Sequence, residues 1–294
     1  MSIRSDYEKK QAERERFYSS YGAIYATHQE KRYVHPFQIY GNVYYVGDSW
    51  VCVHLIDTGD GLLLIDSGNV GAKHLLIHSI WEMGFRPDDV KWIISSHGHL
   101  DHVGAATFFR DMFSTRLYLA EPDARMFAEH PEFSFLQDSP DVMDDVFTPD
   151  EVIRDGDILT FGNTTIQCVL VPGHTEGCVA MFFDACENGR TLRCGYYGGF
   201  GFNTLTCAHL DEMGDTEHRM WKIYEESILK VADRPVDIFL GNHCENNKTL
   251  EKREIQKVHP SPNPFIDSKE WNTYLMSKID DLHAFVQEEK QRQL

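Results

Sequence analysis

The sequence has neither a cluster of basic residues nor a long hydrophobic run. Among its 294 residues, 28 Lys and Arg stand against 46 Asp and Glu, which gives a formal net charge of −18 at pH 7. Proteins that bind nucleic acids need a basic stripe for the phosphate backbone, so this charge argues against such a partner. No apolar segment approaches the roughly 20 residues of a membrane-spanning helix, and residues 1–10 lack the apolar core of a secretory signal. We therefore expect a cytoplasmic protein with a small-molecule substrate and no membrane partner.

The sequence also lacks the cysteine pattern of a disulfide framework. Seven cysteines are present, an odd number, and most of them lie inside apolar segments typical of strands. This placement indicates reduced thiols that pack as small hydrophobic side chains.

Apolar segments alternate with turn signals along residues 35–294, which we expect to form a single α/β domain. Period-two and continuous apolar patterns predict strands at residues 43–46, 51–56, 62–65, 90–94, 115–120, 164–171, 178–184, 191–197 and 236–240. Helical spacing predicts helices at residues 75–85, 104–113, 122–128, 216–232 and 268–293. Each half resembles a sheet with covering helices, and no linker separates the halves. We therefore expect two packed sheets with helices outside.

Residues 1–34 differ from this pattern, because they are rich in charged side chains and show no clear apolar stripe. They predict an exposed helical extension. Such an extension could mediate a homo-oligomer, although a monomer is equally consistent with the sequence.

A histidine-rich segment directly follows the apolar run at residues 90–94. His97, His99, Asp101 and His102 lie within six residues, and Gly98 sits between the first two. A tight strand-to-helix turn can bring such side chains together, whereas a regular element would scatter them. Imidazole and carboxylate are ligands that Zn²⁺ takes, and four in one short segment exceed what a single tetrahedral ion collects there. We expect two metals; the alternative is a solvated histidine-rich loop.

Two further histidines follow strands in a similar way. His174 lies in a Pro-Gly-His-Thr turn after residues 169–171, and His243 lies in a Gly-Asn-His turn after residues 238–240. Either histidine alone would more often be a polar residue in a turn, but beside the first cluster both become candidate ligands. Cys244 adjoins His243, and we exclude it because neighbouring residues of an extended backbone point in opposite directions.

Together, His-x-His-x-Asp-His at 97–102, the two later turns and the Leu-Ile-Asp-Ser-Gly segment at 64–68 resemble the metallo-β-lactamase superfamily. The resemblance implies an αββα four-layer sandwich over residues 35–294. It also implies that His97, His99 and His174 hold one zinc ion. Asp101, His102 and His243 would hold a second. Asp66 would then support the metal loop and fix the tautomer of a ligand imidazole.

The segment at residues 193–201 separates branches of this family. Glyoxalase II and the ribonuclease branch carry a bridging aspartate there, whereas this segment contains no carboxylate. A site without that aspartate and without a cysteine ligand resembles the third lactamase subclass. In that subclass serines aligned with residues 198–202 help hold the lactam carboxylate, and this sequence has glycines and phenylalanine in their place.

The resemblance predicts a hydrolase in which a hydroxide shared by two Zn²⁺ ions opens a cyclic amide of the β-lactam type or a related acyl bond. Asp101 is the candidate catalytic residue, because it could orient the hydroxide and pass its proton to the leaving group. The alternatives are a lactonase or esterase of the same fold and a non-catalytic metal-bearing scaffold. Candidate substrate contacts are Trp50, Tyr196, Tyr197 and Phe200, each of which could equally be a core or surface aromatic residue. We also expect the glycines at 195–201 to leave room for a bulky ligand.

Overall fold

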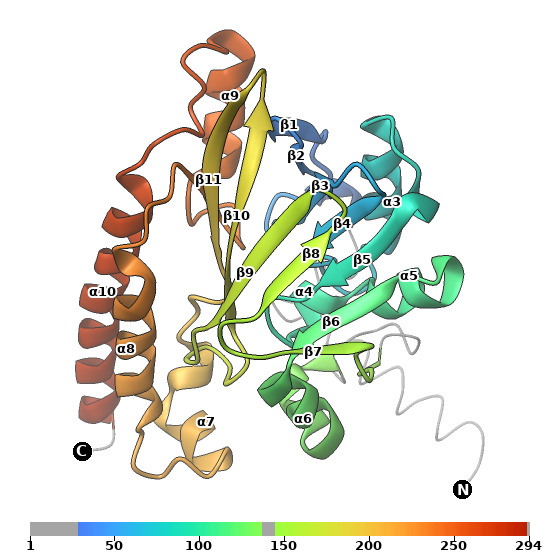
Figure 1. Ribbon diagram of the computed structural model, residues 1–294. Coiled ribbons are helices and arrows are strands. Elements are labelled where there is room, and N and C mark those ends of the chain that lie inside the picture. Colours follow the sequence, from blue (N-terminus) through green and yellow to red (C-terminus); the bar gives the residue numbers. More distant parts are fainter. Residues whose placement is uncertain (1–28, 137–144, 293–294) are drawn as a thin grey trace, which may run out of the picture.

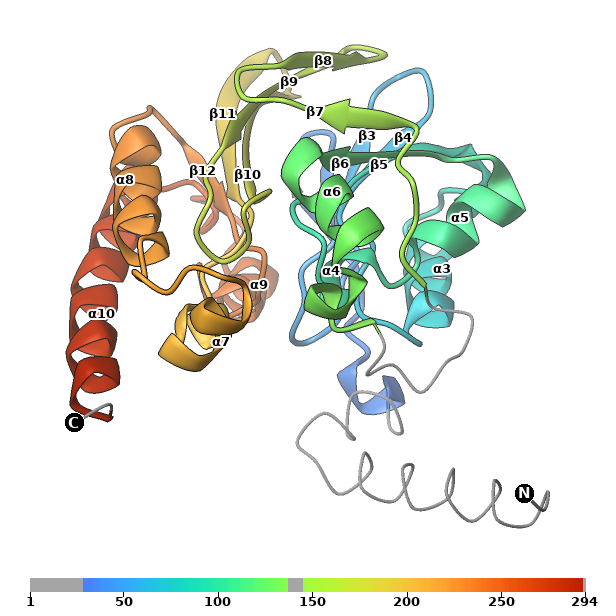
Figure 2. The ribbon, with the colours of Figure 1, turned by 90° about the horizontal axis from the view of Figure 1, so that it is seen from below.

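Two β-sheets pack face to face, and helices cover the outer face of each (Figures 1 and 2). The computed structural model describes residues 29–136 and 145–292. Most of the expected extension at residues 1–34 lies outside the described residues, and its described end forms the short 3₁₀ helix η1 (Gln29–Arg32). No helix in the described ranges combines the length and the apolar character needed to cross a bilayer.

The first sheet contains seven strands in chain order. These are β1 (Phe37–Tyr40), β2 (Val43–Tyr45), β3 (His54–Asp57), β4 (Leu62–Ile65), β5 (Val90–Ile94), β6 (Arg116–Ala120) and β7 (Glu151–Ile153). Strands β1 to β4 pair antiparallel, and β4 to β7 pair parallel. The helical elements between β4 and β7 are α3 (Lys73–Glu82), η2 (Pro87–Asp89), α4 (Leu100–Val103), α5 (Ala106–Phe113), α6 (Glu121–Glu129) and η3 (Pro131–Ser134).

The second sheet has the strand order β12-β11-β10-β9-β8. Strands β8 (Ile158–Phe161), β9 (Thr164–Leu170), β10 (Val179–Glu187) and β11 (Arg190–Tyr197) pair antiparallel, and β12 (Ile238–Leu240) pairs parallel with β11. Its helical elements are η5 (Asn203–Leu205), α7 (Cys207–Glu212), α8 (Met220–Ala232), α9 (Thr249–Val258) and α10 (Glu270–Arg292). Helices α8 and α10 lie side by side along its outer face (Figures 1 and 2).

Strand alternation assigns side chains to the layers. On β10, Met181 and Phe183 point into the core between the sheets, whereas Ala180 and Phe182 pack toward the helices. The stripe Trp271, Leu275, Ile279 and Leu282 of α10 is buried in the same outer layer. Central strands such as β4 bury both faces and read as continuous apolar runs, whereas the edge strand β8 is partly exposed. The expected αββα four-layer sandwich is confirmed.

One expected strand is shorter than its apolar pattern. Strand β3 begins at His54, although residues 51–53 are also apolar and buried. The Cys52 N–H donates to the Asn242 carbonyl oxygen at 2.9 Å, and Val51 forms an isolated antiparallel bridge with His243. The carbonyl oxygens of Val53 and Val51 also accept from Val46 N and Asp48 N, so residues 51–53 join the β2–β3 hairpin to the loop that follows β12.

Candidate metal centre

The histidine-rich segment spans the turn after β5 and the start of α4. His97 and His99 precede the helix, and Asp101 and His102 lie in it. A Cβ atom at Gly98 would lie 2.8 Å from both Met126 Cε and Phe127 Cε1. A Cβ atom at Gly104 would lie 2.3 Å from backbone atoms of Asn69 and Val70. Because real Cβ contacts are not this short, the backbone contacts require glycine at position 104, whereas a side chain at position 98 would have to displace Met126 and Phe127.

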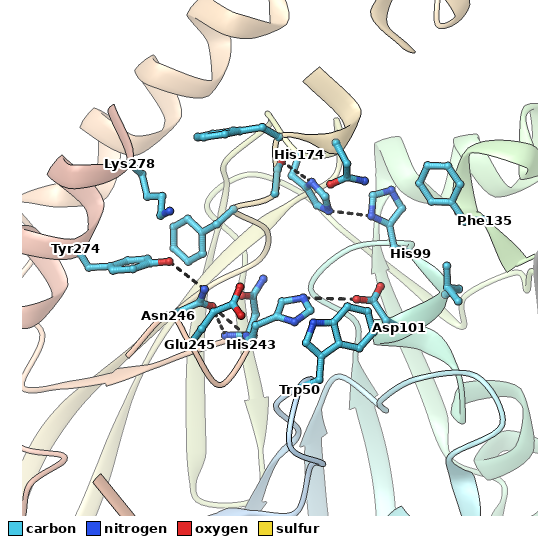
Figure 3. A pocket seen from close by; sticks show the side chains of 16 residues that line it. Trp50, His99, Asp101, Phe135, His174, His243, Glu245, Asn246, Tyr274 and Lys278 are labelled. Atoms are coloured by element: carbon cyan, nitrogen blue, oxygen red, sulfur yellow. Dashed lines mark hydrogen bonds and ion pairs between the residues drawn. The ribbon is translucent and has the colours of Figure 1, made fainter. Parts of the chain in front are cut away.

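The turn after β5 meets the loops after β9 and β12 at the end of both sheets. His99 Nδ1 lies 2.9 Å from His174 Nε2, and His243 Nε2 lies 3.5 Å from Asp101 Oδ2 (Figure 3). Two sets of side chains have ligand atoms within 4.8 Å of one another, and they share His97. The first set is His97, His99 and His174; the second is His97, Asp101 and His102. All six expected ligands are thus brought together.

Hydrogen bonds orient three of the imidazoles. His102 Nδ1 donates to Asp66 Oδ2 at 2.6 Å, and His174 Nδ1 donates to the Gly201 carbonyl oxygen at 2.8 Å. His97 Nδ1 lies 3.1 Å from Ser96 Oγ, which can accept its proton. In these neutral tautomers each Nε2 keeps its lone pair, and each Nε2 faces the cluster.

One of these lone pairs has no protein partner. His97 Nε2 is buried and makes no hydrogen bond to any described residue. A buried polar atom without a partner costs about 1–3 kcal/mol, so such atoms in native proteins call for an explanation. A metal ion bound by His97 Nε2 supplies one, and the imidazole and carboxylate donors around it suit zinc. The residues present therefore fit a metal.

The charges of most of the cluster suit metal binding as well. His102 differs, because burial lowers its pKa but the carboxylates of Asp101 and Asp66 raise it overall. Burial and the neighbouring imidazoles hold the pKa of His97 and of His99 well below the ordinary value. Burial also lowers the pKa of His174 and of His243 to about 4, so these ligands are neutral at pH 7. Burial tends to raise the pKa of Asp101, but the surrounding histidines lower it overall and keep this carboxylate ionised. Metal ligands must be deprotonated in this way.

The carboxylate of Asp66 holds the turn after β5 through hydrogen bonds. Asp66 is fully buried, has a left-handed backbone with φ 62°, and accepts hydrogen bonds from Ser96 N at 2.6 Å and Ser96 Oγ at 2.9 Å. It also accepts from His102 Nδ1 and from the Tyr196 hydroxyl. Asp66 therefore fixes both the path of the turn and the tautomer of His102.

A second buried carboxylate was not recognised in the sequence. Asp123, in the first turn of α6, accepts hydrogen bonds from Gly98 N at 2.7 Å, Gly177 N at 2.8 Å and Thr175 Oγ1 at 2.9 Å. Burial raises the pKa of Asp123 to about 6. It joins the turn that carries His97 and His99 to the loop that carries His174. An aspartate at the start of a short helix is common, so its sequence position gave no signal.

A cavity of about 480 Å³ opens onto the cluster (Figure 3). Trp50 and Phe200, two of the expected substrate contacts, line this cavity together with Phe135 and Phe202. The Trp50 ring lies 5.0 Å from the His243 ring. Polar groups line the same space, and sequence reasoning did not single them out: Asn203, Asn242, Glu245, Asn246, Tyr274 and Lys278.

Tyr196 and Tyr197 do not line the cavity, which corrects their expected role. Tyr196 is fully buried in the core between the sheets, where its hydroxyl donates to Asp66. Tyr197 is 1% exposed on the opposite face of β11, and its ring stacks on Phe200 at 4.6 Å. Both side chains follow from strand alternation, since neighbouring residues of β11 point to opposite faces. Tyr196 therefore contacts the site through Asp66, and Tyr197 contacts it through Phe200.

Among the glycines at 195–201, Gly201 lines the cavity, but a side chain on Gly195, Gly199 or Gly201 would meet other protein atoms. A Cβ atom at Gly199 would lie 2.5 Å from His174 Cδ2, and one at Gly201 would lie 3.0 Å from His174 Cε1. A Cβ atom at Gly195 would lie 2.7 Å from Val236 Cγ2. Protein atoms already fill the space that side chains would occupy.

Comparison with known proteins agrees with this geometry. The family model of the metallo-beta-lactamase superfamily matches residues 51–243, which include all six expected ligands. The chain belongs to the metallo-beta-lactamase superfamily. The expected family is therefore confirmed, and the chain is a metal-dependent hydrolase.

Solved lactamases share the fold of this superfamily member. It is similar to BJP-1 of Bradyrhizobium japonicum, a subclass B3 metallo-beta-lactamase, with 24% identity, a TM-score of 0.76 and coverage of 90% of this chain and 99% of the other. It is also similar to native FEZ-1 of Legionella gormanii, with 25% identity, a TM-score of 0.77 and coverage of 88% and 98%. The suspected similarity to the third subclass is thus confirmed.

A curated relative carries a different activity in its name. The chain is 29% identical over 220 residues to hydroxyacylglutathione hydrolase GloC of Haemophilus influenzae, covering 74% of this chain and 93% of that protein. The superfamily assignment therefore identifies a hydrolase without fixing its substrate.

Proposed function

We propose that this hydrolase binds two zinc ions and hydrolyses a cyclic amide of the β-lactam type or a closely related acyl bond. The observation that carries the proposal is the convergence of His99, His174, Asp101 and His102 on His97, whose Nε2 atom has no partner among the described residues. His243 adjoins this cluster through Asp101, at 3.5 Å. No cysteine takes part, because Cys244 Sγ lies 3.0 Å from the Tyr45 hydroxyl and 3.4 Å from the Asp48 carbonyl oxygen instead. This donor set matches the subclass that the sequence resembles.

His97, His99 and His174 would hold one ion, and Asp101, His102 and His243 would hold the other. Zinc ions bound there would lower the pKa of water to about 7 and polarise the scissile carbonyl. Tautomers fixed by Asp66 and by the Gly201 carbonyl leave the Nε2 atoms of His102 and His174 ready to bind. The chain itself needs no nucleophilic side chain.

Asp101 is the residue we assign to proton transfer. Its carboxylate lies 3.5 Å from His102 Nε2 and from His243 Nε2, and it lines the cavity. An ionised carboxylate in this place can accept a hydrogen bond from the attacking water and later carry a proton to the leaving group. Trp50, Phe135 and Phe200 form apolar walls that suit the hydrocarbon part of an acyl substrate.

A second candidate is hydrolysis of a lactone, an ester or a thioester. The similarity to hydroxyacylglutathione hydrolase GloC favours it, because acylglutathione is a thioester. Glyoxalase II carries a bridging aspartate in the segment that aligns with residues 193–201, and this chain has no carboxylate there. Gly199 also packs too closely against His174 for an aspartate to take its place. We therefore rank the cyclic amide first.

A substrate panel on zinc-loaded protein, with metal content measured on the same sample, tests the proposal. The panel contains nitrocefin, an acyl-homoserine lactone, an aryl ester and an acylglutathione. We expect two zinc ions per chain and turnover of at least one substrate. Asp101→Asn should lower that turnover by about a hundredfold or more, because the proton-transfer group is lost.

The matched control is Asp184→Asn, since Asp184 is half-exposed on β10 and pairs with Arg193 away from the cavity. It should retain wild-type turnover. Near-normal activity of wild-type protein after metal depletion, or of Asp101→Asn, contradicts the proposal.

A further inference from the structure

Helix α10 forms the side of the cavity that faces Asp101 and Phe135. Tyr274 and Lys278 are one helical turn apart on this helix, so their side chains share a face. Both side chains reach into the cavity from the side opposite His99 and Phe135 (Figure 3). Neither residue belongs to the metal cluster or to the proton-transfer step.

Lys278 brings a positive charge into an otherwise acidic protein. It is the only lysine or arginine among the described residues that line the cavity, and its side chain is 20% exposed. Its Nζ atom lies 5.3 Å from the Tyr274 ring centroid and 5.9 Å from the Phe202 ring centroid. These two rings hold the ammonium group at the cavity wall through cation–π attraction.

The existing partner of Lys278 leaves donors available. Nζ donates to Asp281 Oδ2 at 2.8 Å, and the Asp281 side chain is 52% exposed. Ion pairs at exposed positions contribute little, and an ammonium group has three N–H donors. Lys278 can therefore donate to a ligand in the cavity without giving up Asp281.

Tyr274 presents a donor beside this ammonium group. The Asn246 side-chain Nδ2 donates to the Tyr274 hydroxyl at 2.9 Å, and the Oδ1 of Asn246 accepts from His243 N at 2.9 Å. These contacts fix the orientation of the Asn246 amide, so the Tyr274 oxygen acts as an acceptor there. Its own hydrogen remains for a further acceptor. Burial raises the pKa of Tyr274, which keeps the hydroxyl protonated.

We propose that Lys278 and Tyr274 bind a carboxylate of the substrate, so that the hydrolase selects acyl compounds that carry one. This inference rests on the proposed acyl hydrolysis and names its substrate class. An ammonium group and a hydroxyl one turn apart offer two convergent donors to the two oxygens of a carboxylate.

The surroundings favour a singly charged anion over a phosphate. Glu245 lines the same cavity, so its carboxylate opposes an accumulation of negative charge there. A phosphate dianion would need more than one cation, and Lys278 is alone in this role among the described lining residues. The aromatic walls at Trp50, Phe135 and Phe202 suit the hydrocarbon part of such a substrate.

Two esters of equal chain length test the preference. The p-nitrophenyl monoester of glutaric acid ends in a carboxylate, and p-nitrophenyl valerate ends in a methyl group. We expect zinc-loaded wild-type protein to have the higher kcat/KM for the glutarate ester. Lys278→Met, which keeps an unbranched apolar side chain against the two rings, should reduce the ratio of the two kcat/KM values roughly 10- to 100-fold, mainly through KM. Lys278→Arg should restore most of that ratio.

Lys257→Met is the matched control, because Lys257 lies on α9 and pairs with Glu254 three residues away, as Lys278 pairs with Asp281. It should keep the wild-type ratio. A ratio that is the same in wild-type protein and Lys278→Met overturns the proposal.

Binding of glutarate separates this inference from the proposed function. Calorimetry on the zinc-loaded full chain measures the affinity for glutarate. This affinity should fall about tenfold or more in Lys278→Met, and by a smaller factor in Tyr274→Phe. Hydrolysis of both esters without this loss of binding supports acyl hydrolysis and overturns the carboxylate subsite. If Lys278→Met loses glutarate affinity but wild-type protein hydrolyses neither ester, the carboxylate subsite is supported and ester hydrolysis is contradicted.

Discussion

Gly199 shows how a missing side chain shapes the metal centre. A Cβ atom at this position would approach His174 Cδ2 to 2.5 Å and His174 Cβ to 2.9 Å. Real Cβ atoms do not come this close to neighbouring atoms, so any other residue must displace the imidazole or the strand that leads to it. The glycine thus positions His174, which donates its Nδ1 proton to the nearby Gly201 carbonyl.

Gly199→Ala should therefore weaken the first metal site. We expect zinc affinity at that site to fall about 10- to 100-fold, as is usual when a group that orients a ligand is changed. Competition with a chromophoric chelator measures the affinity, and circular dichroism verifies the fold. Gly214→Ala is the control, because no atom lies within 4 Å of a Cβ built there and its φ of 85° makes alanine strained without touching the site. Wild-type affinity in Gly199→Ala would show that His174 tolerates the added methyl group.

At the scale of elements, α6 connects two loops that belong to different sheets. Asp123 accepts hydrogen bonds from Gly98 after β5 and from Thr175 and Gly177 after β9. A Cβ atom at Gly177 would lie 2.5 Å from Asp123 Cγ, so the loop after β9 packs directly on this carboxylate. The relative position of His99 and His174 depends on it.

Asp123→Ala should separate these loops. Three buried donors would lose their acceptor, and each unpaired donor costs about 1–3 kcal/mol unless water replaces the carboxylate. We expect zinc affinity to fall at least about tenfold and the free energy of unfolding to fall by about 3 kcal/mol. Chelator competition and urea unfolding measure the two effects.

Glu129→Ala, at the exposed end of the same helix, controls for substitution on α6 and should change stability by less than about 0.5 kcal/mol. Equal zinc affinity in Asp123→Ala and wild-type protein would contradict the linking role of Asp123.

The sequence predicted the elements whose side chains have a clear period and the ligands that directly follow them. His97, His174 and His243 each come shortly after an apolar strand, which made them recognisable. Asp123, Tyr274 and Lys278 follow no such rule, since their roles depend on loops and helices that meet only in the folded chain. The apolar pattern at 51–53 predicted part of a regular strand, but Val51 and Cys52 pair with the loop around His243. Burial alone does not distinguish these cases.

Across the whole molecule, the two sheets must keep their relative position for the six ligands to meet. The seven-stranded sheet supplies the turn after β5, and the five-stranded sheet supplies His174 and His243 through the loops after β9 and β12. His54 on β3 crosses this boundary, because its Nε2 donates to the Gly241 carbonyl oxygen at 2.9 Å. The Tyr196 ring packs against its edge at 5.7 Å. His54 is therefore a buried connection between the sheets.

This connection should make the metal-free protein sensitive to acid. Burial lowers the pKa of His54 from 6.5 to about 4, so the folded state favours the neutral imidazole. The resulting stabilisation is present above pH 6.5 and is lost as the pH falls toward 4, because only the unfolded chain takes up the proton readily. Between pH 7 and pH 5 this group should account for a loss of about 2 kcal/mol in the free energy of unfolding.

Urea unfolding of metal-free wild-type protein and His54→Gln at both pH values measures this loss. The glutamine amide can still donate toward Gly241 but does not titrate, so the decrease between pH 7 and pH 5 should be about 2 kcal/mol smaller in the variant. The titrations of the ligand histidines occur in both proteins and cancel in the comparison. His130→Gln should behave as wild type, because His130 is largely exposed. If His54→Gln loses as much stability as wild-type protein, another buried group carries the acid sensitivity, and His54 contributes only its hydrogen bond between the sheets.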